Sequence, residues 1–463
     1  MLTGWSDNTP ENPNKPSSLP SSREVSVNVL NAEVVKHDEK LSNMMMLWGQ
    51  FHDHDVTLTP LVKADCSTIC ENTPQHWSCF PIPTPDDPER ACMPFTRSST
   101  TCMGGTPERR EQVNIITAFT DASNVYGSDL DLAEKLRGED GKLKVNDRFT
   151  SAAGKAYMPF DHANKDCRQQ DPNASEDEER IPCFLAGDKR SNEHLALTAI
   201  HTIFVREHNR LASIIKQMNP DFNSDAIYFE TRKLMGAIMQ VITWQEFLPK
   251  LIGDDGIDMM GKYKGYNSKV DPSAFNVFST AAYRSGHTMI HNLTFRLDEN
   301  LEEATHGNLP LHLTFFSPWR LIKEGGLDPI LWGIVGKGNK VAAPNENFDN
   351  ELLNNLFALK HNKNGLDLGA INLQRGRDHG LGTYNDYRAF LFGEKARATT
   401  FEELSDTIKD KLAREKIKSV YKSPDDIDVI AGASMESHDH GIVGPTFQKI
   451  IVKQFKHFRD GDR

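Results

Sequence analysis

The segment from residue 46 to 60 places three polar side chains at the spacing of one helix face. In its sequence, MLWGQFHDHDVTLTP, Gln50 is followed by Asp53 at i+3 and His54 at i+4. Side chains at these spacings lie on the same side of an α-helix, so an amide, a carboxylate and an imidazole would converge on one cavity. When the segment is considered alone, a solvent-exposed polar helix start explains it equally well.

The same segment raises the question of a metal site, because His52, Asp53, His54 and Asp55 are consecutive. On a helix, side chains two residues apart point about 200° away from each other. His52 and His54 therefore cannot share one ion, and we do not expect them to form a metal site.

Two further segments carry charged residues near histidines. In GDKRSNEHLALTA (187–199), Arg190 and Glu193 stand at i and i+3, which as an isolated pair fits a solvated first helical turn. In AAYRSGHTMIHNLTFRLDEN (281–300), Arg284 precedes His287 by three residues and His291 follows it by four. The two histidines could share a metal, but the central Glu of HExxH is absent and no third ligand is evident. One axial ligand and one surface or core histidine is the simpler prediction.

A fourth segment, GAINLQRGRDHGLGTYNDYR (369–388), is dense in Asn, Gln, Arg and Gly. It contains Asn372 and Arg375. Its spacing alone does not indicate a reaction.

All seven cysteines lie between residues 66 and 183, in sequence rich in prolines and turns. Such clustering is typical of loops held by disulfides in an oxidising compartment, although an odd total leaves one thiol over. A zinc site is the competing interpretation, and the irregular spacings disfavour it. Asn173-Ala-Ser and Asn292-Leu-Thr are glycosylation sequons, which agree weakly with secretion.

The charge balance excludes some classes of partner. Asp and Glu total 65 against 53 Lys and Arg, so no broad basic surface is expected for nucleic acid or anionic lipid. The sequence contains no run of 18 apolar residues, which is about the length needed to span a membrane. The polar, Pro/Ser/Asn-rich N-terminus does not look like a signal peptide, so a secreted form would lack its signal here.

The elements that must position these groups are predicted to be helices. Apolar residues follow one stripe over 195–218, and 224–252 and 401–421 look similar, the last opened by a capping box of Thr400 and Glu403. Long connections at 71–110, 138–182 and 340–350 separate the helices, and four of the seven cysteines lie in the first two. The sequence therefore predicts a mainly α domain with short hairpins at most.

Together and in this order, the four segments resemble the signature set of the animal haem peroxidase superfamily, the group of myeloperoxidase, lactoperoxidase, peroxidasin and the peroxinectins. The resemblance runs from about Ser21 to Arg463 and is strongest at WGQFxDHD, TAFTDASNVYGS, REHNRLA, GHT and INLQRGRDHG. It implies a polar arm over 1–25 and one large haem-peroxidase domain over 26–463, truncated at both ends, with few short strands and long disulfide-stapled loops.

The resemblance also implies the residues that act on peroxide. His54 resembles the base that takes a proton from hydrogen peroxide and returns it to the departing oxygen. It must be neutral, and an imidazole pKa near 6.5 predicts that acid weakens activity. Arg190 resembles the arginine that stabilises developing negative charge, and Gln50 the glutamine that holds water or halide.

The resemblance implies that a second set of residues binds haem. His287 looks like the ligand of the haem iron, Asn372 like the acceptor of its ring N–H, and Arg284 and Arg375 like partners of the haem propionates. Asp53 and Glu193 match the carboxylates that form ester links to haem b in many mammalian members. His194 replaces the methionine of myeloperoxidase that forms a third link, so we expect at most two covalent bonds.

A calcium site is implied by the match of residues 117–123 to the family's calcium loop. Its ligands would be the side chains of Thr117, Asp121 and Ser123, the carbonyl of Phe119 and the carboxylate of Asp55. All are oxygen donors, as calcium prefers. An ion beside His54 would order the helix that carries it.

Family disulfides imply three pairs and one leftover thiol. The pairs would be Cys66 with Cys79, Cys70 with Cys92 and Cys167 with Cys183, leaving Cys102 over.

The function implied is reduction of hydrogen peroxide through a ferryl intermediate, with halide, thiocyanate or a small phenol as the reducing substrate, in a secreted protein. One alternative is a fatty-acid dioxygenase of the cyclooxygenase-related branch, for which Tyr283 keeps open the question of a radical tyrosine. Another is an adhesion role with an extracellular-matrix or cell-surface partner, although the chain contains no RGD or KGD triplet.

Overall fold

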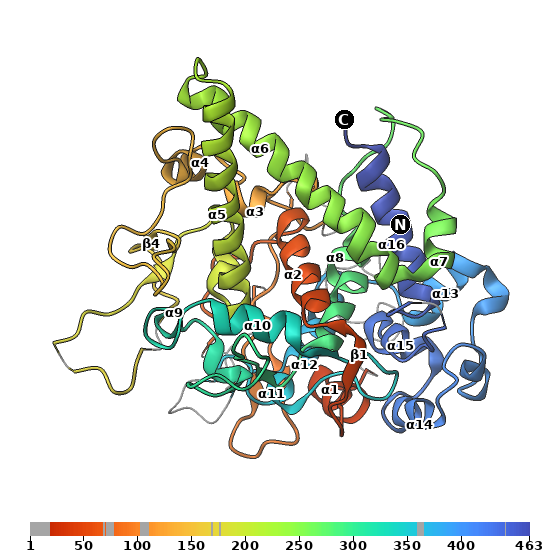
Figure 1. Ribbon diagram of the computed structural model, residues 1–463. Coiled ribbons are helices and arrows are strands. Elements are labelled where there is room, and N and C mark those ends of the chain that lie inside the picture. Colours follow the sequence, from red (N-terminus) through yellow and green to blue (C-terminus); the bar gives the residue numbers. More distant parts are fainter. Residues whose placement is uncertain are drawn as a thin grey trace.

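The computed structural model describes residues 19–67, 70, 78–101, 111–167, 170–175, 177–358, 365–439 and 441–463. Over these residues the fold is mainly helical, as the sequence predicts (Figure 1). The α-helices are α1 (Ser22–Val29), α2 (Met44–Val56), α3 (Ser123–Tyr126), α4 (Leu130–Leu136), α5 (Leu195–Met218), α6 (Ser224–Val241), α7 (Leu248–Met260), α8 (Asn276–Thr280), α9 (Trp319–Lys323), α10 (Asp328–Gly336), α11 (Asn350–Leu353), α12 (Leu368–Asp378), α13 (Tyr384–Phe392), α14 (Lys411–Val420), α15 (Val429–Ser434) and α16 (Pro445–Asp460).

Shorter turns and strands complete the framework. The 3₁₀ helices are η1 (Lys189–Asn192), η3 (Ala282–Met289), η4 (Leu311–Thr314), η5 (Glu394–Ala396), η6 (Glu402–Asp406) and η7 (Pro424–Asp426), and η2 (Ile242–Phe247) is a π-helix. Antiparallel strand pairs join β1 (His37–Ser42) to β8 (Gly338–Lys340), β2 (Ile82–Pro83) to β3 (Cys92–Met93), β4 (Phe160–Asp161) to β5 (Cys183–Phe184), and β6 (Leu293–Thr294) to β7 (Leu309–Pro310).

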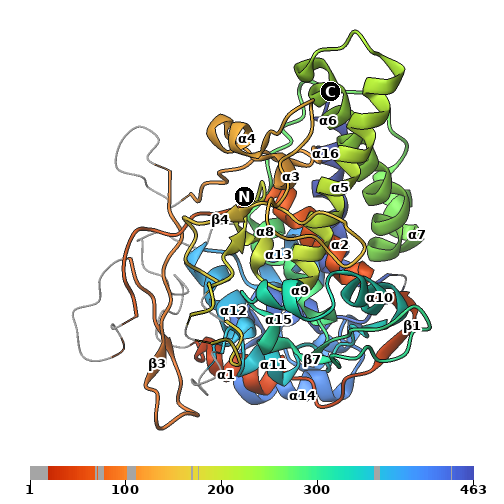
Figure 2. The same cartoon turned by 60° about the vertical axis from the view of Figure 1, so that its left-hand side comes forward.

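Most buried apolar side chains in the described part of the chain belong to one continuous core. Helix α2 runs through it and packs against α5, η2 and η3. The C-terminal helix α14 lies on the side away from α4 in both views (Figure 1 and Figure 2). No described helix is both long and apolar enough to span a membrane.

Helix α5 begins and ends where the sequence predicts. The imidazole of His194 caps it by accepting a hydrogen bond from the Leu197 N–H, and the apolar stripe is buried through Phe204. The last turn departs from the prediction, because Ile214 and Met218 are exposed beside the α5–α6 connection. The helix is therefore fixed mainly through its first half, which lies next to α2.

Two other predicted helices are divided in the structure. The predicted helix over 224–252 is α6, η2 and α7, and Gly253 interrupts α7 with a φ of 69°. The wider π turn brings Phe247 against α2, where a Cβ on Gly49 would lie 3.3 Å from the ring. A side chain at residue 49 would therefore have to displace the Phe247 ring by a few tenths of an ångström.

The predicted helix over 401–421 is wrong as a single element. Residues 402–406 form η6, and α14 begins only at Lys411. The Asp410 carboxylate accepts a hydrogen bond from the Ala413 N–H, which starts a new helix after the buried Ile408. The Glu403 N–H donates to Thr400 Oγ1 at 3.4 Å, which is one half of the predicted capping box, while the Glu403 carboxylate accepts from the Thr399 N–H at 2.7 Å.

Disulfides hold loops between residues 66 and 183. Cys66 bonds Cys79, Cys70 bonds Cys92, and Cys167 bonds Cys183, as the resemblance implies. Cys92 lies in β3 and Cys183 in β5, so two of the bonds anchor hairpins. Cys102 lies outside the described residues.

Candidate haem and peroxide site

Two adjoining cavities lie between α2 and η3. The larger is lined by His54 and His287 together with Asp53, Arg190 and Arg284. The smaller is mostly apolar and shares six lining residues with the larger: Met46, Gln50, Glu193, His287, Ile290 and Leu368. A hollow with charged groups along one part and apolar residues along the other suits a flat amphipathic cofactor such as haem.

His54 lies on α2 at this cavity and is 4% exposed. Its Nδ1 is buried 3.9 Å from Asp188 Oδ1 without a hydrogen-bond partner, which leaves Nε2 as the nitrogen that can face the cavity. Burial and the nearby Arg190 charge hold the pKa of His54 well below its usual 6.5, although Asp188 opposes them. The imidazole is therefore neutral at pH 7, as a proton acceptor must be.

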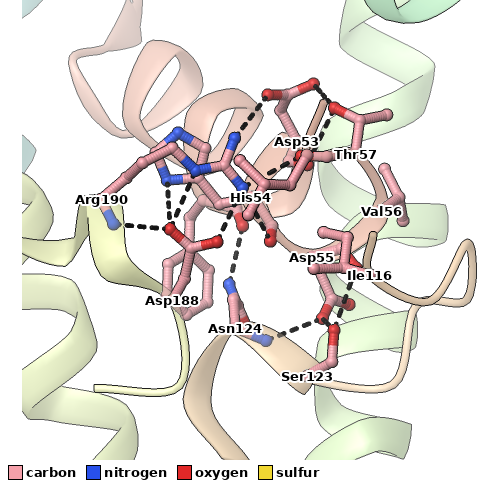
Figure 3. Close-up of polar contacts among 12 residues, drawn as sticks. Asp53, His54, Asp55, Val56, Thr57, Ile116, Ser123, Asn124, Asp188 and Arg190 are labelled. Atoms are coloured by element: carbon pink, nitrogen blue, oxygen red, sulfur yellow. Dashed lines mark hydrogen bonds and ion pairs between the residues drawn. The ribbon is translucent and has the colours of Figure 1, made fainter. Parts of the chain in front are cut away.

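Arg190 is held beside His54 by a two-pronged ion pair (Figure 3). Its Nε donates to Asp188 Oδ1 at 2.9 Å and its Nη2 to Asp188 Oδ2 at 2.7 Å. Nη2 also donates to the carbonyl of Thr57 at 3.0 Å, and Nη1 lies 3.9 Å from Asp53 Oδ2. This fork fixes the direction of the guanidinium group, so its charge has a defined place in the cavity wall.

Gln50 belongs to a hydrogen-bonded chain that crosses from α2 to α5. Because His194 Nδ1 accepts from the backbone, its Nε2 carries the proton and donates to Gln50 Oε1 at 2.7 Å. Gln50 Nε2 in turn donates to Glu193 Oε2 at 3.2 Å. His194, noted in the sequence only as a departure from myeloperoxidase, thus sets the orientation of Gln50.

Two carboxyl groups of the cavity are placed where the charged form is disfavoured. Burial raises the pKa of Glu193 to about 7, against the opposing charge of Arg190. Burial also raises the pKa of Asp53, which accepts a hydrogen bond from Thr57 Oγ1 at 2.8 Å. Asp53 lines the cavity from α2, and Glu193 lines it from the position directly after η1.

His287 lies on η3, and the amide of Asn372 reaches its ring from α12. Asn372 Nδ2 is 2.9 Å from His287 Nδ1, while Asn372 Oδ1 accepts from Arg284 Nη1 at 2.7 Å. The expected partner is therefore in place, but Arg284 holds the oxygen that was expected to face the ring. Burial, followed by the charge of Arg284, lowers the pKa of His287 to about 3, so the ring is neutral and can bind a metal.

Arg375 also lines the cavity from α12. Its Nη1 lies 3.1 Å from Asp378 Oδ2 and donates to the carbonyl of Thr96, and its guanidinium carbon sits 4.1 Å from the Phe95 ring centre. Burial lowers its pKa to about 10, so the group stays charged at pH 7. Arg284 and Arg375 thus form a positive end of the cavity.

The residues expected to bind calcium meet at the end of α2. Asp55 Oδ2 accepts from the Asp121 N–H at 3.0 Å, Asp55 Oδ1 accepts from Ser123 Oγ at 3.0 Å, and Thr117 Oγ1 lies 3.3 Å from Asp121 Oδ1. Figure 3 shows Asp55 pointing to Ser123, away from Arg190. Burial and the charge of Asp121 raise the pKa of Asp55 to about 8, because two carboxylates share a buried place.

No group of three or more His, Cys, Asp or Glu side chains that could together hold a metal ion occurs in the described ranges. The calcium donors do not make such a cluster, since they comprise two carboxylates with hydroxyl groups and a carbonyl.

Sequence reasoning missed Asp188, which holds Arg190 and lies beside His54. Its position two residues before Arg190 looks like a helix cap, and it does accept from the Arg190 N–H at 2.8 Å. Sequence reasoning also missed His201 of α5. Its ring packs edge-on against Phe51, and both ring nitrogens have no hydrogen-bond partner in the described structure. Only tertiary packing brings Asp188 and His201 near α2.

Comparisons with known proteins identify relatives of this chain. The chain is 41% identical to the mouse (Mus musculus) peroxidasin homolog over 469 residues, covering 96% of this chain and 31% of that protein. It is 41% identical to human thyroid peroxidase over 476 residues, covering 96% of this chain and 50% of that protein. The chain thus spans a third to a half of the length of these relatives.

Solved structures share the fold. Peroxidase A from Dictyostelium discoideum superposes with a TM-score of 0.81 at 26% identity, covering 96% of this chain and 83% of the other. The fatty acid alpha-dioxygenase of Oryza sativa superposes at 0.73, but its 19% identity, over 98% of this chain and 74% of the other, shows the fold alone. The model of the family described as animal haem peroxidase matches residues 4–463. The chain therefore belongs to the animal haem peroxidase family.

Proposed function

We propose that the protein is a haem peroxidase that reduces hydrogen peroxide and oxidises halide, thiocyanate or a small phenol. The observation that supports this most is the joint placement of neutral His54 and the fixed charge of Arg190 on the cavity that His287 also lines. A general base, a charge stabiliser and a metal ligand are what peroxide reduction needs.

The residues divide the work as follows. Haem bound in the cavity would supply the redox chemistry that splits the peroxide O–O bond. His54 Nε2 takes a proton from one oxygen of peroxide and returns it to the other oxygen, which leaves. Arg190 stabilises the negative charge that develops on that oxygen, and Gln50, held by His194, orients water or halide beside it.

A test of the function starts from the haem-loaded protein. Addition of hydrogen peroxide should change the visible spectrum, and iodide, bromide, thiocyanate or tyrosine should restore it with turnover. If none of the four donors supports turnover, the proposal is contradicted. Peroxide-primed oxygen uptake with a polyunsaturated fatty acid, in place of donor oxidation, would indicate the dioxygenase alternative.

Arg284 and Arg375 are proposed partners of the haem propionates. If a propionate draws Arg284 away, Asn372 Oδ1 is released from its 2.7 Å hydrogen bond and its amide can turn to accept the His287 ring N–H. That contact fixes the tautomer with a free Nε2 for iron and makes the ring more basic. Asp53 and Glu193 are the proposed sites of ester links, at most two.

Calcium is proposed at Asp55, Thr117, Phe119, Asp121 and Ser123. The support is the buried pair of carboxylates, whose mutual repulsion a divalent cation would remove. Because Asp55 follows His54 directly on α2, a bound ion would also fix the end of the helix that carries the base.

Removal of calcium should lower both stability and activity. At free calcium about 100-fold above Kd, a ligand that binds only the folded state adds about 2.7 kcal/mol to the free energy of unfolding. A strong chelator should therefore lower the melting temperature and the turnover, and added calcium should restore both. Chelator already saturated with calcium is the control, and Asp121→Asn should respond less. An unchanged melting temperature and turnover would remove the calcium proposal.

The pH profile tests the state of His54. Since its pKa is held well below 6.5, the neutral base persists in mild acid, and the acid limb of the reaction with peroxide should lie below pH 6.5. Asp188→Asn removes the charge that raises this pKa, so the limb should move to still lower pH. Stopped-flow rates from pH 4 to 8 measure both, and a limb at or above 6.5 in the unaltered protein would contradict the assignment.

Secretion is proposed as well, supported by the three disulfides, which persist in oxidising compartments. Of the two sequons, Asn173 is exposed, whereas Asn292 is half-buried with its amide oxygen shut off from solvent. A glycan is therefore proposed at Asn173.

A further inference from the structure

Lys340, the last residue of β8, is fully buried. Its ammonium group is surrounded by backbone carbonyl oxygens. Nζ donates to the carbonyls of Thr288 at 2.9 Å, Val341 at 3.2 Å, Glu346 at 2.5 Å and Asn347 at 3.0 Å. Lysine is almost never fully buried unless its charge is paired or well hydrogen-bonded. The four carbonyls therefore explain how this charge is tolerated inside the protein.

The lysine keeps its charge in this place. Burial lowers the pKa of Lys340 to about 8, and the charges of Glu346 and Asp349 oppose that change, so the group is still charged at pH 7. Both carboxylates are engaged elsewhere, because Glu346 accepts from the Glu33 and Val34 N–H groups and Asp349 caps α11. A neutral side chain at residue 340 would thus remove a donor from four carbonyls, and buried acceptors without a donor are costly.

The Thr288 carbonyl belongs to the end of η3, the helix that carries His287. This 3₁₀ helix is eight residues long, and 3₁₀ helices of more than three or four residues are uncommon because their hydrogen bonds are poorly aligned. The backbone becomes extended at Ile290, so the helix does not continue. The last carbonyls of a helix need donors from outside and attract cations. Lys340 supplies both a donor and a cation to Thr288.

This contact acts on the candidate iron ligand from outside the cavities. His287 and Ile290 line both cavities, whereas Thr288 and Lys340 line neither. The ring of His287 is held separately, because Asn372 Nδ2 of α12 lies 2.9 Å from its Nδ1. The side chain and the backbone of the candidate ligand are therefore held by two different elements.

The same ammonium group holds the long connection that follows β8. Three of its four carbonyl partners belong to the loop of residues 341–347. None of these seven residues lines either cavity. A single buried charge thus joins a loop outside the site to the helix that carries His287.

We propose that Lys340 is a positioning residue for His287, because its charged group caps the end of η3 and ties that end to the loop of residues 341–347. With the cap in place, the backbone at His287 keeps one position and the imidazole meets iron in one orientation. Without it, the end of η3 relaxes and the ligand is held less firmly. The inference rests on the haem ligation by His287 that belongs to the proposed function, but it does not require the bound haem to react with peroxide.

Lys416 of α14 offers a matched control. Its Nζ donates to the carbonyls of Asn31 at 3.1 Å and Asn345 at 3.0 Å, so a second ammonium group holds the same loop. Lys416 is half-buried, and these two partners lie outside η3. Its loss should therefore weaken the loop without releasing the end of the helix that carries His287.

The experiment compares Lys340→Met with Lys416→Met in the haem-loaded protein. Methionine keeps much of the length of lysine but has neither charge nor N–H. In Lys340→Met, haem should dissociate about 10-fold faster, the lower end of the effect of losing a group that orients a metal ligand. The iron–histidine stretching line in the Raman spectrum of the reduced protein should move to lower frequency and broaden. Lys416→Met should lower the melting temperature and leave both the rate and the line unchanged.

A conservative variant separates the charge from its fit. Lys340→Arg keeps the positive charge, but its planar group matches four converging carbonyls less well than a compact ammonium group. Its rate of haem dissociation should therefore lie between those of the unaltered protein and Lys340→Met. A rate in Lys340→Arg equal to that in Lys340→Met, with an unchanged stretching line in both, would count against positioning.

The outcomes keep this inference apart from the peroxidase function. In folded Lys340→Met, an unchanged stretching line and a dissociation rate within twofold of the unaltered protein overturn the role of Lys340. Equal changes in Lys416→Met overturn it as well, because weakening of the loop would then be sufficient. If the protein binds haem through a histidine but does not react with peroxide, the peroxidase function fails and the role of Lys340 is still decided. If it does not bind haem in this way, both fail.

Hydrogen exchange of the unaltered protein decides the question if Lys340→Met does not fold. Haem loading should slow the amide exchange of residues 285–290 and, through Lys340, that of residues 341–347, although the latter line neither cavity. Residues 411–420 of α14 serve as the control and should exchange at the same rate with and without haem. Slowing confined to residues 285–290 overturns the proposal.

Discussion

Replacement of His54 by glutamine should slow the reaction of the haem-loaded protein with hydrogen peroxide by about 1000-fold, within the range of a positioned proton-transfer group. Glutamine fills a similar volume but does not take up a proton at neutral pH. The loss should appear in the second-order rate constant with peroxide and much less in the later oxidation of donors. Stopped-flow absorbance measures the first step directly.

The control for this prediction is His208→Gln. His208 is a fully buried histidine on α5 with two hydrogen bonds, but it does not line the cavities. Its replacement tests the cost of losing a buried imidazole without touching the candidate base. A His54→Gln protein that takes up haem and reacts with peroxide within threefold of the unaltered protein would exclude His54 as the base.

Replacement of Arg190 by glutamine should cost about 100-fold or more in the same rate constant, by analogy with removal of a donor that stabilises a developing oxyanion. Arg190→Lys keeps the charge but loses the fork that fixes it on Asp188 at 2.9 and 2.7 Å, so an intermediate rate is expected. The order of rates, arginine above lysine above glutamine, separates charge from positioning.

Arg377 provides the matched control for this series. It is a mostly buried arginine that donates to both oxygens of Asp428 at 2.9 and 2.8 Å, and it does not line the cavities. Arg377→Lys breaks an equivalent fork and should leave the peroxide rate unchanged in protein that is folded. Equal losses in Arg190→Lys and Arg377→Lys would mean that the effect is one of stability.

Local pattern predicted the parts of the fold whose stability is local. Helix α5 has its own N-cap and apolar stripe, so its bounds follow from the sequence. The predicted helix over 401–421 failed because burial of Ile408 and the cap at Asp410 favour a break where the periodicity continues. The π turn of η2 was also missed, because the sequence periodicity continues through it while Phe247 packs beside Gly49 of α2.

The candidate site divides in a similar way. Residues in recognisable motifs, such as His54, Arg190 and His287, could be proposed from the sequence through a family resemblance, and all three line one cavity in the structure. Asp188 could not, because an aspartate before a helix is most often a cap. Lys340 lies in none of these motifs, and its partner Thr288 is distant in sequence, so no local pattern connects them.

The sequence by itself determined the helical class, the main helix and, through its motifs, which side chains are available for chemistry. The tertiary structure alone decided their protonation, their partners and the direction in which they point. The physical reason is that burial and charges from distant segments set a pKa, as Asp188 and Arg190 do for His54. Spacing along one helix carries no information about groups that other elements bring to its face.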